Sequence, residues 1–137
     1  GIAVDTENGL MVPVVKGADQ KSMLEIAKET FNLAELARTR KIDLADLQGS
    51  TFTITNVGSL GGVYATPIIN YPEAAILALG KITDKPIVIN NKVEIRKCLP
   101  LSLAFDHRIL DGAEAARFMN KLIEILENPK LISNHEK

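Results

Sequence analysis

The residues best suited to catalysis lie near the C-terminal end of the chain, where Asp106-His107-Arg108 precedes Asp111-Gly112. A histidine flanked by carboxylates can have one ring nitrogen fixed while the other accepts a proton. The surrounding pattern places His107 between a predicted strand and a predicted helix, where rigid scaffolds often present functional groups. A surface ion-pair cluster without chemical function would show the same residues, so the local pattern leaves both interpretations open.

A second group of polar side chains lies on a predicted strand, Thr51-Phe52-Thr53-Ile54-Thr55. Because successive side chains of a strand point to opposite faces, the three threonines share one face. A hydroxyl in such a position can donate a hydrogen bond to an oxyanion that develops during a reaction. Threonine is also common in strands for steric reasons alone, and that is the more ordinary explanation.

The composition disfavours several other kinds of site. His107 and His135 are the only histidines and Cys98 is the only cysteine, which argues against a metal site and against an internal disulfide. The net charge is −1 with no basic run, so nucleic acid is not an expected partner. No apolar stretch approaches the roughly 18 residues of a membrane span. The loop Gly58–Gly62 lacks the spacing of a phosphate-binding loop.

The elements that position these residues are strands and helices in mixed order, which predicts an α+β fold with a mixed sheet. Asn8-Gly9 is typical of a hairpin turn. The continuous apolar run Ala74–Leu79 indicates a central strand that is buried on both faces. Residues 133–137 are polar and are expected to fray. Strands are expected at residues 2–4, 10–15, 51–55, 74–79, 87–89, 93–96 and 99–105.

Two helices are predicted from capping boxes, in which a cap residue and the residue three positions later bond reciprocally. Ser22 with Glu25 begins the first helix, and Asp111 with Glu114 begins the second. Apolar residues follow each cap with helical spacing. Asn128-Pro129 is expected to end the second helix, because proline cannot continue the hydrogen-bond ladder.

Several motifs together resemble one family. Asp106–Gly112, read as Asp-His-Arg-Ile-Leu-Asp-Gly, is similar to the active-site signature of dihydrolipoamide acyltransferases, the core components of 2-oxo acid dehydrogenase complexes. The resemblance implies a chloramphenicol acetyltransferase-like fold. Residues 1–137 would then be the C-terminal part of the catalytic domain, truncated at its N-terminus and without the lipoyl and peripheral-subunit-binding domains. Further stretches match in order and spacing: Asn8–Val14, Thr51–Asn56, Gly58–Gly62, Thr66–Asn70 and Leu101–Leu103.

The resemblance assigns catalytic roles to three residues. His107 matches the family's general base, which takes the proton from the thiol of coenzyme A or dihydrolipoamide before the thiolate attacks a thioester. Free imidazole titrates near pH 6.5 and a free thiol near 8.5, which are close enough for proton transfer worth about 10²–10⁴-fold. Thr55 matches the hydroxyl that donates to the oxyanion. Asp111 matches an acidic or amide position that orients the histidine, and it also fits an ordinary helix cap.

The function implied by the resemblance is acyl transfer between dihydrolipoamide and coenzyme A, with acetyl or branched-chain groups ahead of succinyl. Coenzyme A is then a substrate, the lipoyl group is carried on an absent domain, and no metal is needed. The residues that would hold coenzyme A are not identified by the pattern. A pyruvate dehydrogenase complex is the expected context, in the cytoplasm of a bacterium or archaeon or in the mitochondrial matrix of a eukaryote.

The family also implies an assembly. Its chains form homotrimers that build larger cubic or icosahedral cores, and the active site lies between threefold-related subunits. The expected partners are the 2-oxo acid decarboxylase/dehydrogenase component and dihydrolipoamide dehydrogenase. Two alternatives stay open from the residues alone. The chain is a non-catalytic structural fragment of such a core, or it belongs to an acyltransferase of the same fold that does not use lipoamide.

Overall fold

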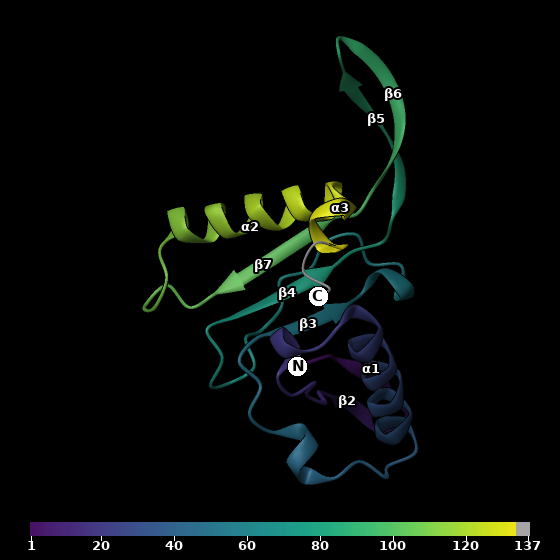
Figure 1. The fold of residues 1–137 in the computed structure, drawn as a ribbon, viewed down its shortest axis with the longest axis vertical. Helices are drawn as coiled ribbons and strands as arrows, with labels where there is room; N and C mark the ends of the chain where they lie inside the picture. Colours follow the sequence, from purple (N-terminus) through teal and green to yellow (C-terminus); the bar gives the residue numbers. More distant parts are fainter. Residues whose placement is uncertain (134–137) are drawn as a thin grey trace.

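A three-stranded sheet lies at the centre of the computed structural model, which describes residues 1–133 (Figure 1). Strand β4 lies between a parallel neighbour, β3, and an antiparallel neighbour, β7, so the predicted mixed sheet is confirmed. Two antiparallel pairs, β1–β2 and β5–β6, lie outside it. The elements are β1 (Val4–Thr6), β2 (Gly9–Met11), α1 (Met23–Arg38), β3 (Thr53–Asn56), β4 (Ala75–Leu79), β5 (Thr83–Ile89), β6 (Lys92–Cys98), β7 (Leu101–Phe105), α2 (Gly112–Glu127) and α3 (Pro129–Ser133).

Strand β4 is the most deeply buried element of the fold. Its residues from Ala75 to Ala78 are each exposed by 6% or less, which confirms the central strand predicted from the apolar run. In the sheet, Thr55 of β3 is level with Ala78, and Ala78 is level with Ser102 of β7. This register fixes how far apart the two outer strands hold their functional residues.

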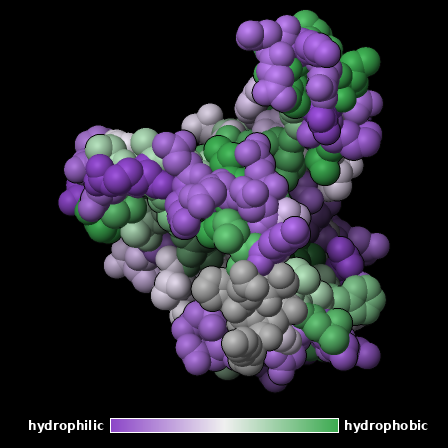
Figure 2. All heavy atoms as spheres, turned by 45° about the horizontal axis from the view of Figure 1, so that its top comes forward, coloured by the Kyte–Doolittle hydropathy of each residue, from purple (hydrophilic) through white to green (hydrophobic). Residues whose placement is uncertain are grey.

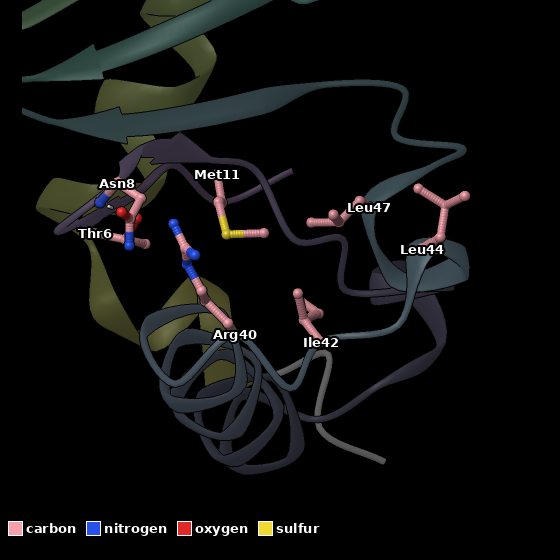
Figure 3. A pocket seen from close by; sticks show the side chains of 7 residues that line it. All are labelled: Thr6, Asn8, Met11, Arg40, Ile42, Leu44 and Leu47. Carbon is pink, nitrogen blue, oxygen red and sulfur yellow. Dashed lines mark hydrogen bonds between the residues drawn. The ribbon is translucent and has the colours of Figure 1, made fainter.

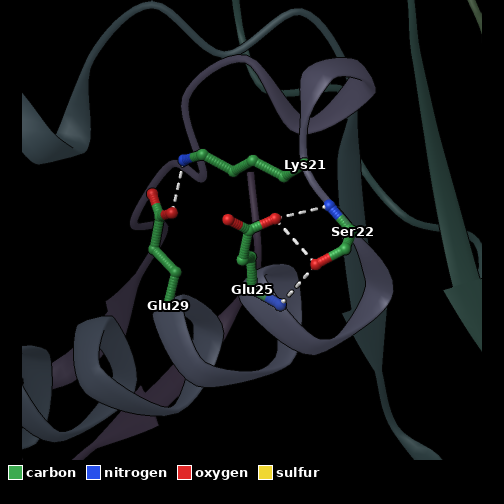
Figure 4. Close-up of polar contacts among 4 residues, drawn as sticks. All are labelled: Lys21, Ser22, Glu25 and Glu29. Carbon is green, nitrogen blue, oxygen red and sulfur yellow. Dashed lines mark hydrogen bonds and ion pairs between the residues drawn. The ribbon is translucent and has the colours of Figure 1, made fainter. Parts of the chain in front are cut away.

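Helix α1 begins at the predicted capping box (Figure 4). The Ser22 hydroxyl accepts a hydrogen bond from the Glu25 N–H at 3.3 Å, and the Glu25 carboxylate accepts from the Ser22 hydroxyl at 2.7 Å and its N–H at 2.8 Å. These bonds, the side-chain bond first, hold the pKa of Glu25 below its usual range. Lys21 pairs with Glu29 on the next turn. The helix buries Leu33 and Ala37 and thereby covers one side of the molecule.

The β5–β6 hairpin projects from the body of the molecule and is longer than predicted (Figure 1). Asn90 and Asn91 form its turn with φ of 50° and 60°, the left-handed pair that a two-residue hairpin turn requires. Strand pairing extends to Thr83 and Cys98, and the next pair, Asp84 and Lys97, forms an ion pair. Figure 2 shows both hydrophobic and hydrophilic side chains on this projection. Three apolar residues are more than two thirds exposed there: Val88, Val93 and Ile95.

Several element boundaries differ from the predicted ones for local reasons. Strand β7 begins at Leu101 rather than at residue 99, because Pro100 has no N–H to donate to a strand partner. Helix α2 ends at Glu127 with Asn128 as its cap, so the end predicted at Asn128-Pro129 is confirmed. A short helix, α3, then begins at Pro129, since proline suits the first position of a helix. Of residues 133–137, for which fraying is predicted, Ser133 ends α3 and residues 134–137 lie outside the described residues.

Candidate active site

His107 lies in the turn that follows β7, and its side chain is exposed in the single chain. The N–H of Asp106 donates to the Ala74 carbonyl at 2.8 Å, so the strand pairing extends to the residue before the histidine. The imidazole lies against Phe105, with 5.6 Å between the ring centroids and 37° between the ring planes. The predicted strand-exit position is therefore confirmed, and the ring is open to a reactant.

Asp106 and Arg108 form a two-pronged ion pair around the histidine. The carboxylate accepts from the Arg108 N–H at 2.9 Å, from Nε at 3.0 Å and from Nη2 at 2.6 Å. The hydrogen bonds from Arg108, those of the side chain first, lower the pKa of Asp106 to about 2. Of the surface cluster of Asp106, Arg108 and Asp111 that the sequence left open, the Asp106–Arg108 pair thus exists, and within residues 1–133 no ion pair includes Asp111. Because it also closes the turn that carries His107, the pair is compatible with a functional histidine.

Asp111 caps helix α2, as the sequence predicts. Its Oδ1 accepts from the Glu114 N–H at 2.8 Å, and the Glu114 carboxylate accepts from the Asp111 N–H at 3.2 Å. Within residues 1–133, no hydrogen bond joins Asp111 to His107. The cap is confirmed, and a role in orienting the histidine stays a prediction.

Thr55 is half-buried on β3, two strands away from the strand that leads to His107. Phe105 lies three residues beyond Ser102, the residue of β7 on the level of Thr55. With strands about 4.8 Å apart and a rise of about 3.3 Å per residue, the Cα atoms of Thr55 and Phe105 are about 14 Å apart. His107 comes after Phe105. The fold therefore does not bring Thr55 and His107 of one chain into contact.

The sequence interpretation missed Glu73, which is only 6% exposed. Its Oε1 accepts from the Thr53 hydroxyl at 2.7 Å, from the Asn70 amide at 3.1 Å, and from the Ser50 hydroxyl. Among the described residues, Oε2 has no hydrogen-bond partner. One signal was present in the sequence: Glu73 is the single acidic residue immediately before the apolar run of β4.

A pocket of about 420 Å³ lies beside the histidine turn and is lined by Asp106, Arg108 and Glu73 together with apolar side chains that include Ile68 and Tyr71. A second pocket, of about 360 Å³, lies between the β1–β2 hairpin and the end of α1 (Figure 3). Arg40 points into this second pocket, which none of the three predicted catalytic residues lines. His107, Asp111 and Thr55 do not line the first pocket either, but Asp106 and Arg108, the two neighbours of His107 in the turn, do.

Residues 1–133 contain no group of three or more His, Cys, Asp or Glu side chains arranged to hold a metal ion. The helices of this part of the chain include none that is long and apolar enough to cross a membrane.

Comparison with known proteins identifies the family. Residues 1–133 match the sequence profile of the 2-oxoacid dehydrogenases acyltransferase catalytic domain. The chain belongs to this family. A relative from Acholeplasma laidlawii, the dihydrolipoyllysine-residue acetyltransferase component of its pyruvate dehydrogenase complex, is 52% identical over 96% of this chain. The match covers 24% of that relative, so the chain spans about a quarter of its length.

Solved structures of family members show the same fold. The dihydrolipoamide acetyltransferase of Azotobacter vinelandii superposes with a TM-score of 0.93 at 45% identity, over 96% of this chain and 54% of that one. Its crystallographic and enzymatic study concerns a serine, a histidine and an asparagine in the catalytic mechanism. The histidine follows the serine by 52 positions and precedes the asparagine by 4. The cubic core of a pyruvate dehydrogenase multienzyme complex matches with the same TM-score, identity and coverage.

Proposed function

We propose that this chain is the C-terminal part, residues 1–137, of an acyltransferase catalytic domain that moves an acetyl group between dihydrolipoamide and coenzyme A. The relative from Acholeplasma laidlawii carries out the acetyltransferase function of a pyruvate dehydrogenase complex, as its name states. The mixed sheet with packed helices fits a chloramphenicol acetyltransferase-like fold. Acetyl transfer is ranked first because the relatives from Acholeplasma laidlawii and Bacillus subtilis are named as acetyltransferases.

The spacing of three residues carries this proposal. Thr55 and His107 are 52 positions apart, and His107 and Asp111 are 4 apart. The serine, histidine and asparagine of the Azotobacter enzyme have the same two separations. Threonine replaces serine with the hydroxyl kept. Aspartate replaces asparagine and keeps a side-chain oxygen, although it brings a charge that the amide lacks.

The proposed reaction needs a base and an oxyanion donor. A ring nitrogen of His107 takes the proton from the attacking thiol, and the thiolate adds to the thioester carbonyl. The Thr55 hydroxyl donates to the oxyanion of the tetrahedral intermediate. When this intermediate collapses, the carbon–sulfur bond to the leaving thiol breaks, and the imidazolium returns the proton to that sulfur. The step neither gains nor loses a proton or an acyl group. In one direction of acyl transfer coenzyme A is the attacking thiol and dihydrolipoamide the leaving thiol, and in the other direction these roles are reversed.

The geometry of the single chain supports a site that is shared between chains. Thr55 and His107 of one chain lie too far apart to act on the same substrate. His107 of one chain must therefore act together with Thr55 of a neighbouring chain. Ile68 and Tyr71, which line the pocket beside the histidine turn, are 90% and 92% exposed. Exposed apolar side chains of this kind mark protein–protein contacts. We therefore propose a homotrimer, the assembly that supports a larger core.

The remaining parts of the proposal concern the whole protein. The lipoyl group is carried by a separate domain, and coenzyme A is a diffusing substrate. The 2-oxo acid dehydrogenase component supplies the acyl group, and dihydrolipoamide dehydrogenase reoxidises the dithiol. The complex works in a bacterial or archaeal cytoplasm, or in the mitochondrial matrix of a eukaryote.

An acyl-transfer assay with dihydrolipoamide and acetyl-coenzyme A tests the function. It is run on residues 1–137 and on the catalytic domain with the preceding half included. Transfer by the longer form supports the proposal. Transfer by the longer form alone identifies residues 1–137 as a structural part that needs the rest of the domain. Transfer to other thiols or amines, with none to dihydrolipoamide, contradicts the use of lipoamide.

Mixing two inactive variants tests whether the site is shared. In a trimer assembled at random from equal amounts of His107→Ala and Thr55→Val chains, about a quarter of the shared sites contain both intact residues. We expect about a quarter of the wild-type rate after co-refolding, although each variant alone is nearly inactive. A site built within one chain would recover nothing, so an inactive mixture of folded trimers contradicts the shared site.

The two capping boxes separate the structural and catalytic roles of Asp111. Loss of either cap, in Asp111→Ala or Ser22→Ala, should lower the free energy of unfolding by about 1 kcal/mol. Only Asp111→Ala should also lower kcat, because Ser22 lies on the distant helix α1. Asp111→Asn should preserve both, since asparagine caps as well as aspartate. Urea unfolding and steady-state assays measure the two effects, and equal kcat in both alanine variants would exclude a catalytic role.

A further inference from the structure

Glu73 joins three segments of the chain through one buried carboxylate oxygen. Oε1 accepts from Ser50 and Thr53, which lie before and at the start of β3, and from Asn70 in the loop before β4. The Glu73 N–H also donates to the Asn70 carbonyl at 2.8 Å. Thr53 is 1% exposed and Glu73 is 6% exposed, so water does not compete for these hydrogen bonds.

This cluster lies next to Thr55 in the strand. Thr53 and Thr55 are two residues apart on β3, so their side chains share one face of the sheet. Thr53 is level with Ile76 and Thr55 with Ala78 on the buried strand β4. The hydrogen bond from the Thr53 hydroxyl therefore joins β3 to Glu73 at a point two residues before Thr55.

Glu73 is also next in sequence to a residue that contacts the histidine turn. The residue after Glu73, Ala74, accepts the hydrogen bond from the Asp106 N–H that extends the pairing of β7. Glu73 and Asp106 also line the same pocket. The Glu73 cluster thus lies between the strand that bears Thr55 and the turn that bears His107.

We propose that Glu73 is a positioning residue for acyl transfer, which sets the place of the Thr55 hydroxyl through its hydrogen bond to Thr53. This inference rests on the proposed function, since it needs Thr55 to donate to the oxyanion. Glu73 itself touches no reacting atom. Burial of a polar oxygen without a hydrogen-bond partner costs free energy, and among the described residues Oε2 of Glu73 has no such partner.

The expected effect of disturbing the cluster is on turnover rather than on binding. An oxyanion contact exists mainly in the transition state, so a displaced hydroxyl lowers kcat and leaves KM nearly unchanged. Misplacement of a catalytic group by about 1 Å can cost about 100-fold. In the catalytic domain that includes this chain, Thr53→Val should therefore lower kcat by about 10- to 100-fold.

The test is a double-mutant cycle with Thr53→Val and Thr55→Val. If Thr53 acts by placing the Thr55 hydroxyl, the first change should have little further effect on kcat once that hydroxyl is gone. Thr53→Ser keeps the hydroxyl and should retain most of the rate. Glu73→Gln keeps an oxygen acceptor and should resemble Thr53→Ser, whereas Glu73→Leu should resemble Thr53→Val. Leu33→Ala, a core change on α1, controls for a general loss of stability and should leave kcat unchanged below the unfolding temperature.

The outcomes separate this inference from the function on which it rests. Effects on kcat that multiply in the double variant, or an unchanged kcat in Thr53→Val, overturn the positioning role while leaving the role of Thr55 intact. If Leu33→Ala lowers kcat as much as Thr53→Val does, the loss is due to reduced stability, and the positioning role is again overturned. Unchanged turnover in Thr55→Val alone overturns both, because the hydroxyl being placed would then have no function.

Discussion

Replacement of His107 by alanine should lower kcat by about 10²–10⁴-fold, the usual contribution of a general base. The loss should appear in both directions of acyl transfer, since the same imidazole accepts the proton from either thiol. The side chain is exposed and packs mainly against Phe105, so the variant should fold normally. Steady-state rates with dihydrolipoamide and acetyl-coenzyme A, together with thermal unfolding, measure both expectations.

His107→Asn is the matched control for this substitution. It keeps a polar side chain in the turn but has no base that titrates near neutral pH, so it should be as inactive as the alanine variant. Ionisation of Asp106 does not contribute to the pH dependence of kcat in the assay range. Its pKa is about 2, and the group therefore stays ionised and paired with Arg108 throughout the assay range, losing that pairing only as the pH falls through about 2. Turnover retained in either variant would remove His107 from the mechanism.

Replacement of Thr55 by valine should lower kcat by about 10²–10³-fold, the cost of removing one oxyanion donor. Valine has nearly the same shape as threonine and suits a strand, so β3 should keep its pairing with β4. The Michaelis constants for both substrates should change little, because the lost hydrogen bond forms mainly in the transition state. Separate kcat and KM values for each substrate provide the measurement.

Two further substitutions make this result specific. Thr51→Val removes a hydroxyl from the same side of the same segment, but Thr51 is exposed and lies before β3, so turnover should not change. Thr55→Ser keeps the hydroxyl and should keep most of the rate. A change in KM without a change in kcat would show that Thr55 contacts substrate without stabilising the oxyanion.

The subunit-mixing experiment links these two substitutions. Neither variant alone shows whether the site is shared between chains, because both variants are expected to be inactive. Together they report whether the base and the hydroxyl come from different chains. The separation of about 14 Å between the Cα atoms of Thr55 and Phe105, obtained from strand geometry, is the reason to expect recovery.

Elements whose sequence signal spans only a few neighbouring residues were predicted well. The capping boxes at Ser22 and Asp111 form as expected, because each depends on residues only three positions apart. The apolar run of β4 is central, since a strand without polar alternation has no face that can meet water. The length of the β5–β6 hairpin was underestimated because charged residues there are paired across strands, as Asp84 is with Lys97.

The sequence by itself determined which side chains could do the chemistry. The motif around His107 and its spacing from Thr55 are properties of the chain order, and they identify the candidate base and hydroxyl without coordinates. Only the tertiary structure decided how these residues are held. The register of β3, β4 and β7 separates them within one chain, and the burial of Glu73 beside Thr53 depends on segments that meet only on folding. The pairing of β3, β4 and β7 and the hydrogen bond between Thr53 and Glu73 join residues that are 20 or more positions apart in the chain, so the sequence around each residue does not specify them.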